Sequence, residues 1–228
     1  MLGTLTAVGG AAIAGACGAS SSPTTPSTGT STMGDASGGT TGGACAVIPS
    51  ETEGPYPDRT GMINNSAFYR QDITEGKPGT PLVLALTVVT VAGGCTPVAD
   101  ATIEVWHCDH TGGYSEYTTA GTYLRGLQKT DASGRATFTT IYPGWYQGRA
   151  THVHLEVFVN GSLVKTTQMA FPEDVTAAVD AQGVYASRGQ NTTTNSRDNV
   201  FSDGVASELA TMTGSVVSGY TASLQIGI

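Results

Sequence analysis

The segment from His152 to Val159 alternates between two kinds of side chain. Its odd-numbered positions are apolar: Val153, Leu155, Val157 and Val159. Its even-numbered positions are His152, His154, Glu156 and Phe158. Because successive side chains of a β-strand point to opposite faces, this period of two predicts a strand whose apolar row faces a core. The two histidines then lie side by side on the other face, where imidazole nitrogens are suitable ligands for zinc, copper, nickel or iron.

Other segments also favour β structure. Four of them are rich in β-branched residues or leucine, which favour strands: residues 81–91, 101–106, 136–141 and 162–169. Asn160-Gly161 is a strong hairpin turn before the last of these. Only residues 172–180 favour a helix, with Glu173 and Asp174 in its first turn. Short strands separated by close turn signals are typical of an antiparallel β-sandwich, so we expect a mainly β fold with few short helices.

The charge of the chain excludes one class of partner. The sequence has 10 Lys and Arg against 18 Asp and Glu, a formal net charge of -8, and no basic block. Binding to nucleic acid or to an anionic membrane through charge is therefore not expected. The 31 glycines suit a turn-rich β protein.

The N-terminal segment has the character of an export signal. Residues 2–16 are uncharged and moderately apolar, and Ala14-Gly15-Ala16 forms a small-residue site before Cys17. The pattern also resembles a bacterial lipoprotein site, where a lipid on Cys17 would tether the protein to a membrane. The first basic residue is Arg59, so the usual positive n-region is missing. We expect residues 1–17 to be a signal or lipoprotein-like segment and the protein to be exported, either extracellular or at the cell surface.

Residues 18–44 consist almost entirely of small residues, serine, threonine and proline, with one charge at Asp35. Such a segment buries too little apolar surface to offset its ordering entropy, so we expect a disordered linker. A single folded domain then occupies residues 45–228. Three cysteines remain there, and a disulfide is expected in an exported protein. Cys95 with Cys108 is the preferred pair, and Cys45 with either one is the alternative.

Tyr146, six residues before His152, narrows the choice of metal. A phenolate is a hard, anionic oxygen donor suited to a high-valent ion, and the segment around Tyr114 adds a second phenol. His107 shares a predicted strand face with Ile103 and Val105, which favours a buried, satisfied histidine over a ligand.

Three further segments stand in order around the histidine pair: residues 51–56 (ETEGPY), 103–114 (IEVWHCDHTGGY) and 134–146 (GRATFTTIYPGWY). In this order and spacing they resemble the intradiol ring-cleavage dioxygenases, the family of catechol and protocatechuate dioxygenases. The Trp-His-Cys-Asp variant at 106–109, with an exported start, is most similar to the extracellular or lipoprotein branch. The resemblance covers roughly residues 45–203.

The resemblance implies one mononuclear, non-haem Fe(III) per chain, held by two tyrosines and two histidines. The matching positions are Tyr114, Tyr146, His152 and His154. It also implies that Tyr146 leaves the metal when substrate binds. Arg149 matches the arginine that stabilises negative charge on the substrate, and Gln168 matches a polar active-site position.

Four further residues are candidates for contact with substrate: Pro55, Tyr56, His110 and Trp145. The resemblance places the first two near the substrate. Trp145 adjoins a ligand, and His110 precedes a glycine turn that could lie at the mouth of the pocket. For Trp145, as for Trp106, packing is the simpler role.

The implied activity is the insertion of both atoms of O2 into a catechol-type ring, which gives a cis,cis-muconate type diacid. No nicotinamide, flavin or external reductant is needed. Two alternatives stay open: a zinc hydrolase or cupin-like metalloprotein that uses the histidine pair, and an exported binding module of transthyretin-like or carbohydrate-binding type. Neither the preferred catechol derivative nor the oligomeric state follows from the sequence.

Overall fold

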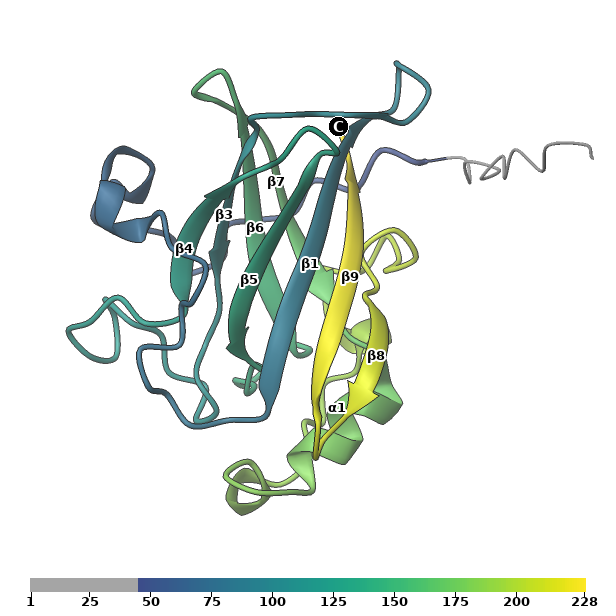
Figure 1. The fold of residues 1–228 in the computed structure, drawn as a ribbon. Helices are drawn as coiled ribbons and strands as arrows, with labels where there is room; N and C mark the ends of the chain where they lie inside the picture. The colour runs from purple at the N-terminus through teal and green to yellow at the C-terminus, as the bar shows by residue number, and fades with distance from the viewer. Residues whose placement is uncertain (1–44) are drawn as a thin grey trace, which may run out of the picture. The chain divides into compact units, whose positions relative to one another are not determined.

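The computed structural model describes residues 45–228, which form two β-sheets that share one hydrophobic core (Figure 1). The expected export segment, the Cys17 lipid site and the linker of residues 18–44 lie outside the described residues. The strands are β1 (Pro81–Thr90), β2 (Thr96–Pro97), β3 (Thr102–Trp106), β4 (Arg125–Lys129), β5 (Arg135–Ile141), β6 (His152–Val159), β7 (Ser162–Ala170), β8 (Thr211–Ser215) and β9 (Gly219–Gly227). The helices are α1 (Glu173–Asp180) and the 3-10 turns η1 (Met62–Asn64), η2 (Ser66–Phe68), η3 (Ala186–Arg188) and η4 (Asn195–Arg197).

The sandwich agrees with the fold that the sequence predicts. One sheet has the order β4-β3-β6-β7, and all its pairs are antiparallel. In the other sheet, β1 pairs with β5 and β2 antiparallel and with β9 parallel, and β9 pairs with β8. Figure 1 shows β1, β5 and β9 in front of β3, β6 and β7. Among the strand pairs of residues 45–228, the parallel β1–β9 pair departs from a purely antiparallel sandwich.

The core forms between the apolar faces of the two sheets. β1 contributes Leu82, Leu84 and Leu86, all buried. From the opposite sheet, β6 contributes Val153 and Leu155 together with Val157, as its alternation predicts. Full burial of each such side chain stabilises the fold by about 1.5–3 kcal/mol. This core fixes the register of β6 and therefore the direction in which its histidines point.

The other face of β6 is buried as well, because loops cover it. β6 is an interior strand between β3 and β7, and its register places His154 between Trp106 and Gln168. His152 and His154 are both buried. The polar face of this sheet is therefore a second interior, enclosed by the segments that precede β1, follow β3 and precede β6.

The disulfide differs from the expected one. Cys45 is joined to Cys95, and Cys108 is a free, buried thiol, so the preferred pairing of Cys95 with Cys108 is wrong. The chain near Cys45 runs beside the end of β9, where Ile48 N donates to Gly227 O, and so reaches the turn after β1. Cys108 instead lies under the polar face, where its Sγ contacts Gly144 O. With a sequence separation of 50 residues, loop closure stabilises the fold by about 4 kcal/mol in the chain-entropy account.

The predicted helix is present as α1, from Glu173 to Asp180, with two acidic residues in its first turn. Its buried side includes Thr176 and Val179, and the Thr176 hydroxyl is hydrogen-bonded to Tyr142 Oη at 2.8 Å. Within residues 45–228, no helix has the length and apolar character needed to cross a membrane.

Candidate active site

Four predicted ligands meet above the polar face of β6, and we call them the tyrosine–histidine cluster: Tyr114, Tyr146, His152 and His154. The Nε2 atoms of the two histidines are 3.1 Å apart, and Tyr146 Oη lies 3.2 Å from His152 Nε2. The Tyr114 ring centroid is 5.8 Å from that of Tyr146 and 6.2 Å from that of His154. The loop after β3 and the loop before β6 thus deliver two phenols to the histidine pair that the strand supplies.

The hydrogen bonds of His152 determine which of its nitrogens carries the proton. Its Nδ1 lies 2.6 Å from Ala150 O, and a carbonyl oxygen only accepts, so Nδ1 carries the proton. Burial, and then the charge of Arg149, lower the pKa of His152 to about 3, so the ring is neutral at pH 7. Nε2 therefore presents a lone pair to the cluster, which is the tautomer that a metal ligand needs.

The ring of His154 is held on two sides. Trp106 stacks on it with centroids 4.8 Å apart and planes 4° apart. At its edge lies the backbone of Gly54, which has φ +70, and a Cβ there would be 2.9 Å from His154 Cε1. Glycine at position 54 thus allows both the left-handed turn and the close approach. Burial, and then His152, lower the pKa of His154 well below its usual value, so this ring is also neutral.

Tyr114 is the most buried phenol of the cluster. Its Oη has no hydrogen-bond partner among the described residues. Burial, and then the neighbouring Cys108 and Tyr146, raise its pKa well above the usual value. Leaving such an oxygen unpaired costs about 1–3 kcal/mol, and a bound cation would remove that cost and favour the phenolate.

The donor set therefore fits a hard, highly charged metal ion. It combines the unpaired Tyr114 Oη with the neighbouring Tyr146 Oη and the lone pair of His152. Two phenolates and two neutral imidazoles would leave Fe(III) with a net charge of +1 in a buried site. Zinc is usually bound by histidine, cysteine and carboxylate ligands, so this set favours iron.

Arg149 occupies the side of the cluster nearest to β7. Its Nε donates to both carboxylate oxygens of Asp198, at 2.9 and 2.8 Å, and its Nη2 donates to Gln168 Oε1. Its Nη1 lies 3.4 Å from both Tyr146 Oη and His152 Nε2. Gln168 is held in turn by a 2.8 Å hydrogen bond from its Nε2 to Thr52 O. The structure therefore brings Arg149 and Gln168 to the cluster and fixes the guanidinium beside it.

The sequence gives no sign of the role of Asp198. Its carboxylate is fully buried and also accepts the backbone N–H of Ala150 at 2.7 Å and of Val200 at 2.9 Å. It lies 49 residues from Arg149 in the chain. A general rule could have indicated such a partner, because an arginine that is largely shielded from solvent requires a counter-charge. Nothing in the local sequence identifies which acid supplies that charge.

The four candidates for substrate contact are placed differently from one another. Tyr56 stacks on Tyr114 with centroids 4.5 Å apart and meets Tyr146 edge-on at 5.7 Å, so it packs against both phenols of the cluster. Pro55 is exposed beside it. Trp145 donates from Nε1 to Gly189 O at 3.2 Å and carries Arg188 over its ring.

His110 points elsewhere. Its ring meets Tyr185 edge-on at 6.2 Å, and no ring contact within residues 45–228 joins it to the tyrosine–histidine cluster. His107 is buried with both nitrogens bonded, to Cys108 O at 2.8 Å and to Thr140 Oγ1 at 2.7 Å. This agrees with the expectation that His107 is a satisfied core histidine.

Comparison with known families and sequences gives one consistent set of relatives. A family model described as Dioxygenase matches residues 52–208. Catechol 1,2-dioxygenase 1 of Acinetobacter lwoffii is 29% identical over 148 residues, which are 55% of this chain and 47% of the relative. Catechol 1,2-dioxygenase 2 of the same organism is 30% identical over 146 residues, which are 55% of this chain and 52% of the relative. The chain spans about half the length of the curated relatives it matches.

Solved structures extend the likeness over more of the chain. An intradiol ring-cleavage dioxygenase from Tetranychus urticae superposes with a TM-score of 0.72 and 25% identity, over 81% of this chain and 94% of that one. The dioxygenase domain of a dioxygenase carbohydrate-binding protein fusion from Streptomyces sp. SirexAA-E gives a TM-score of 0.60 and 27% identity, over 80% of this chain and 98% of that one. Sequence and fold thus lead to the same group of proteins.

Proposed function

Because this chain belongs to the intradiol ring-cleavage dioxygenases, we propose that it cleaves small catechol-type aromatic rings with O2, using one non-haem Fe(III) bound by the tyrosine–histidine cluster. The family assignment argues against a non-enzymatic binding module. The observation that carries the proposal is that the unpaired buried phenol of Tyr114 lies beside Tyr146 and His154, and that Tyr146 and His154 in turn meet Nε2 of His152. Bound there, iron(III) would supply the Lewis acidity and one-electron chemistry that allow an aromatic diol to react with O2.

We propose that Tyr146, rather than Tyr114, is the phenol of the cluster that reacts with the incoming substrate. It is only partly buried, whereas Tyr114 is buried beneath Tyr56. Burial raises the pKa of Tyr146, although Arg149 opposes the shift, so its phenolate would be a good base. Tyr146 Oη would then accept a proton from a hydroxyl of the incoming diol.

Arg149 is proposed to stabilise the negative charge of the deprotonated diol and of its ring. Its charge is held in place by Asp198 and Gln168 before substrate arrives, so little reorganisation is needed when negative charge develops. The guanidinium also lies near Tyr146 Oη and would stabilise the phenolate there. Tyr56, which touches both phenols of the cluster, would form part of the wall against which the aromatic ring packs.

We also propose that the protein is exported. The Cys45–Cys95 disulfide supports this, because disulfides persist in oxidising compartments. Cell fractionation would test export, and incorporation of labelled fatty acid, lost in Cys17→Ser, would test the lipid tether.

Oxygen uptake tests the proposed activity directly. Iron-loaded protein should consume O2 in proportion to substrate with at least one of catechol, protocatechuate, hydroxyquinol and a caffeoyl-type diol. The ultraviolet spectrum should show formation of a muconate-type diacid. Oxygen consumption by none of the four diols, or purification of a colourless protein with stoichiometric zinc, would contradict the proposal.

A further inference from the structure

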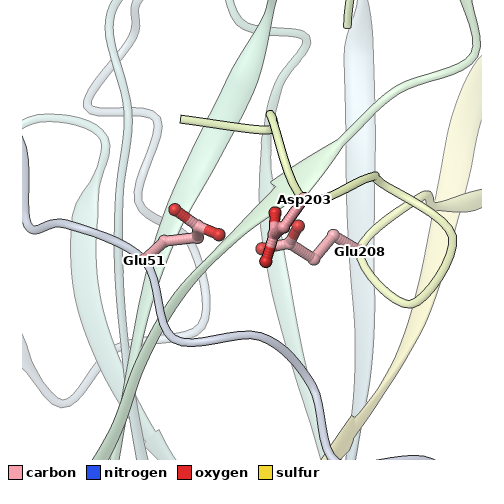
Figure 2. A group of neighbouring side chains, drawn as sticks. All are labelled: Glu51, Asp203 and Glu208. Carbon is pink, nitrogen blue, oxygen red and sulfur yellow. The ribbon is translucent and has the colours of Figure 1, made fainter. Parts of the chain in front are cut away.

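Three carboxylates that the tyrosine–histidine cluster does not use lie close together, and we call them the acidic cluster: Glu51, Asp203 and Glu208. One oxygen from each residue lies within 4.8 Å of those of the other two. Figure 2 shows Glu51 reaching from the segment before β1 toward the carboxylates of Asp203 and Glu208, which the loop before β8 supplies. Two parts of the chain that are far apart in sequence thus converge on one negatively charged point.

Glu208 is the residue that makes this cluster more than a surface feature. The side chain is 0% exposed. Its Oε1 accepts a hydrogen bond from Thr167 Oγ1 at 3.1 Å, but its Oε2 is buried and has no partner in the described part of the chain. Burial and then the charge of Glu51 raise the pKa of Glu208 to about 8. A buried carboxylate oxygen of this kind requires either a cation or a proton.

The described residues supply no cation of their own. None of the ion pairs within residues 45–228 includes a member of the acidic cluster. Burial, and then the charge of Asp203, raise the pKa of Glu51; Arg149 opposes this shift, but its Nε is already held by both oxygens of Asp198. The negative charge of the acidic cluster therefore has no basic side chain paired with it.

We propose that the acidic cluster binds a hard divalent cation, for which Ca²⁺ is the probe. Three carboxylates offer only oxygen ligands, which suit Ca²⁺, Mg²⁺ or Mn²⁺ rather than soft metals. The exposed Asp203 gives the ion a path from solvent, and the buried Oε2 of Glu208 marks the inner ligand. The acidic cluster shares no residue with the tyrosine–histidine cluster, so the two metal sites are separate.

The position of the acidic cluster suggests a structural role for the bound cation. Glu51 precedes Thr52, whose carbonyl accepts Gln168 Nε2, and Glu208 is bonded to Thr167, the neighbour of Gln168. A cation in the acidic cluster would join these two segments on either side of Gln168. It would hold in place the end of the site where Gln168 meets Arg149.

A shared proton is the competing explanation, with a protonated Glu208 bound to Asp203. Calorimetric titration distinguishes cation binding from a shared proton. The sample is the iron-loaded full chain, from which divalent cations have been removed with a chelating resin. The cation proposal predicts one Ca²⁺ per chain at pH 7, with a dissociation constant on the order of 10⁻⁴ M. It also predicts a melting temperature that rises with calcium. The visible spectrum is followed throughout to verify that the iron stays in place.

Two substitutions locate the binding. Glu208→Gln and Asp203→Asn each remove one charged ligand and should weaken calcium binding by roughly tenfold or more. Asp174→Asn, in the exposed first turn of α1, makes the same change of charge elsewhere and should bind as the wild type does. The proposal is overturned if the wild type shows neither heat nor a melting shift with Ca²⁺, Mg²⁺ or Mn²⁺. Equal binding by Glu208→Gln and Asp174→Asn would overturn it as well, and if the variants fail to fold, the wild-type titration alone decides.

Discussion

The two faces of β6 are equally buried and serve different purposes. Val153, Leu155 and Val157 are 0% exposed on one face, and on the other His154 is 0% and His152 is 3% exposed. The valines and leucine need only close packing, which the opposite sheet provides. The histidines carry nitrogens that need partners: His152 has Ala150 O and Tyr146 Oη beside it, whereas His154 Nδ1 has none among residues 45–228. Burial alone therefore does not separate a core from a site; the difference is whether the buried atoms are satisfied within the fold.

Removing a histidine from the polar face should have the largest effect. His154→Ala should lose iron and reduce oxygen uptake by more than about 100-fold, because even residues behind metal ligands contribute 10–100-fold. Phe158→Ala, on the same face of β6 but away from the cluster, is the matched control and should retain iron. Iron content and oxygen uptake are measured together. Full iron occupancy and normal turnover in His154→Ala would remove this residue from the site.

A substitution on the apolar face should damage stability instead. Leu155→Ala should lower the free energy of unfolding by about 2–5 kcal/mol, since it leaves a cavity between the two sheets. The fraction that remains folded should still bind iron, because the polar face is unchanged. Denaturant unfolding and iron content would be compared. A loss of iron without a loss of stability would contradict the assignment of packing to one face and metal binding to the other.

His107 offers a further test of the comparison between the two faces, because it is a buried histidine and both of its ring nitrogens are hydrogen-bonded. Burial lowers its pKa from 6.5 to about 4. The unfolded chain therefore binds the proton more tightly, so the contribution of His107 to stability is complete above pH 6.5. It is lost as the pH falls toward 4, by about 1.4 kcal/mol per pH unit. His107→Gln, which does not titrate, should flatten this part of the stability profile measured by denaturant unfolding; an unchanged slope would contradict the assignment.

Asp198 should show a smaller effect that acts through Arg149. Asp198→Asn keeps the shape of the side chain but removes the counter-charge, and kcat/KM should fall about 10–100-fold. Asp131→Asn is a suitable control, because Asp131 also accepts backbone N–H groups, of Ser133 and Arg135, at an exposed turn. The control should leave turnover per folded molecule unchanged. Equal losses of activity in both variants would show that Asp198 only supports its loop.

The parts of the molecule that the sequence predicts are those with a local cause. The period of two in β6 and the acidic first turn of α1 are properties of adjacent residues, so both elements were found where the pattern indicates. The parallel β1–β9 pair and the Cys45–Cys95 disulfide depend on how distant segments meet, and no local pattern reports that.

The residues of the candidate site likewise divide into those that the sequence predicts and those that it does not. The histidine pair follows from strand geometry, whereas Tyr114 and Tyr146 were found through the ordered motifs of a family. Asp198 has neither kind of signal, and the orientation of its loop toward Arg149 is visible only in three dimensions.

The visible spectrum of the iron-loaded protein tests most directly whether the tyrosine–histidine cluster holds a ferric ion. Charge transfer from two phenolates to Fe(III) predicts a red-brown wild type, and Tyr114→Phe and Tyr146→Phe should each bleach part of the visible band. Tyr56→Phe, which alters a neighbouring phenol outside the cluster, should leave the band intact. A colourless wild type at full iron occupancy, or a band that both ligand substitutions leave unchanged, would contradict the account.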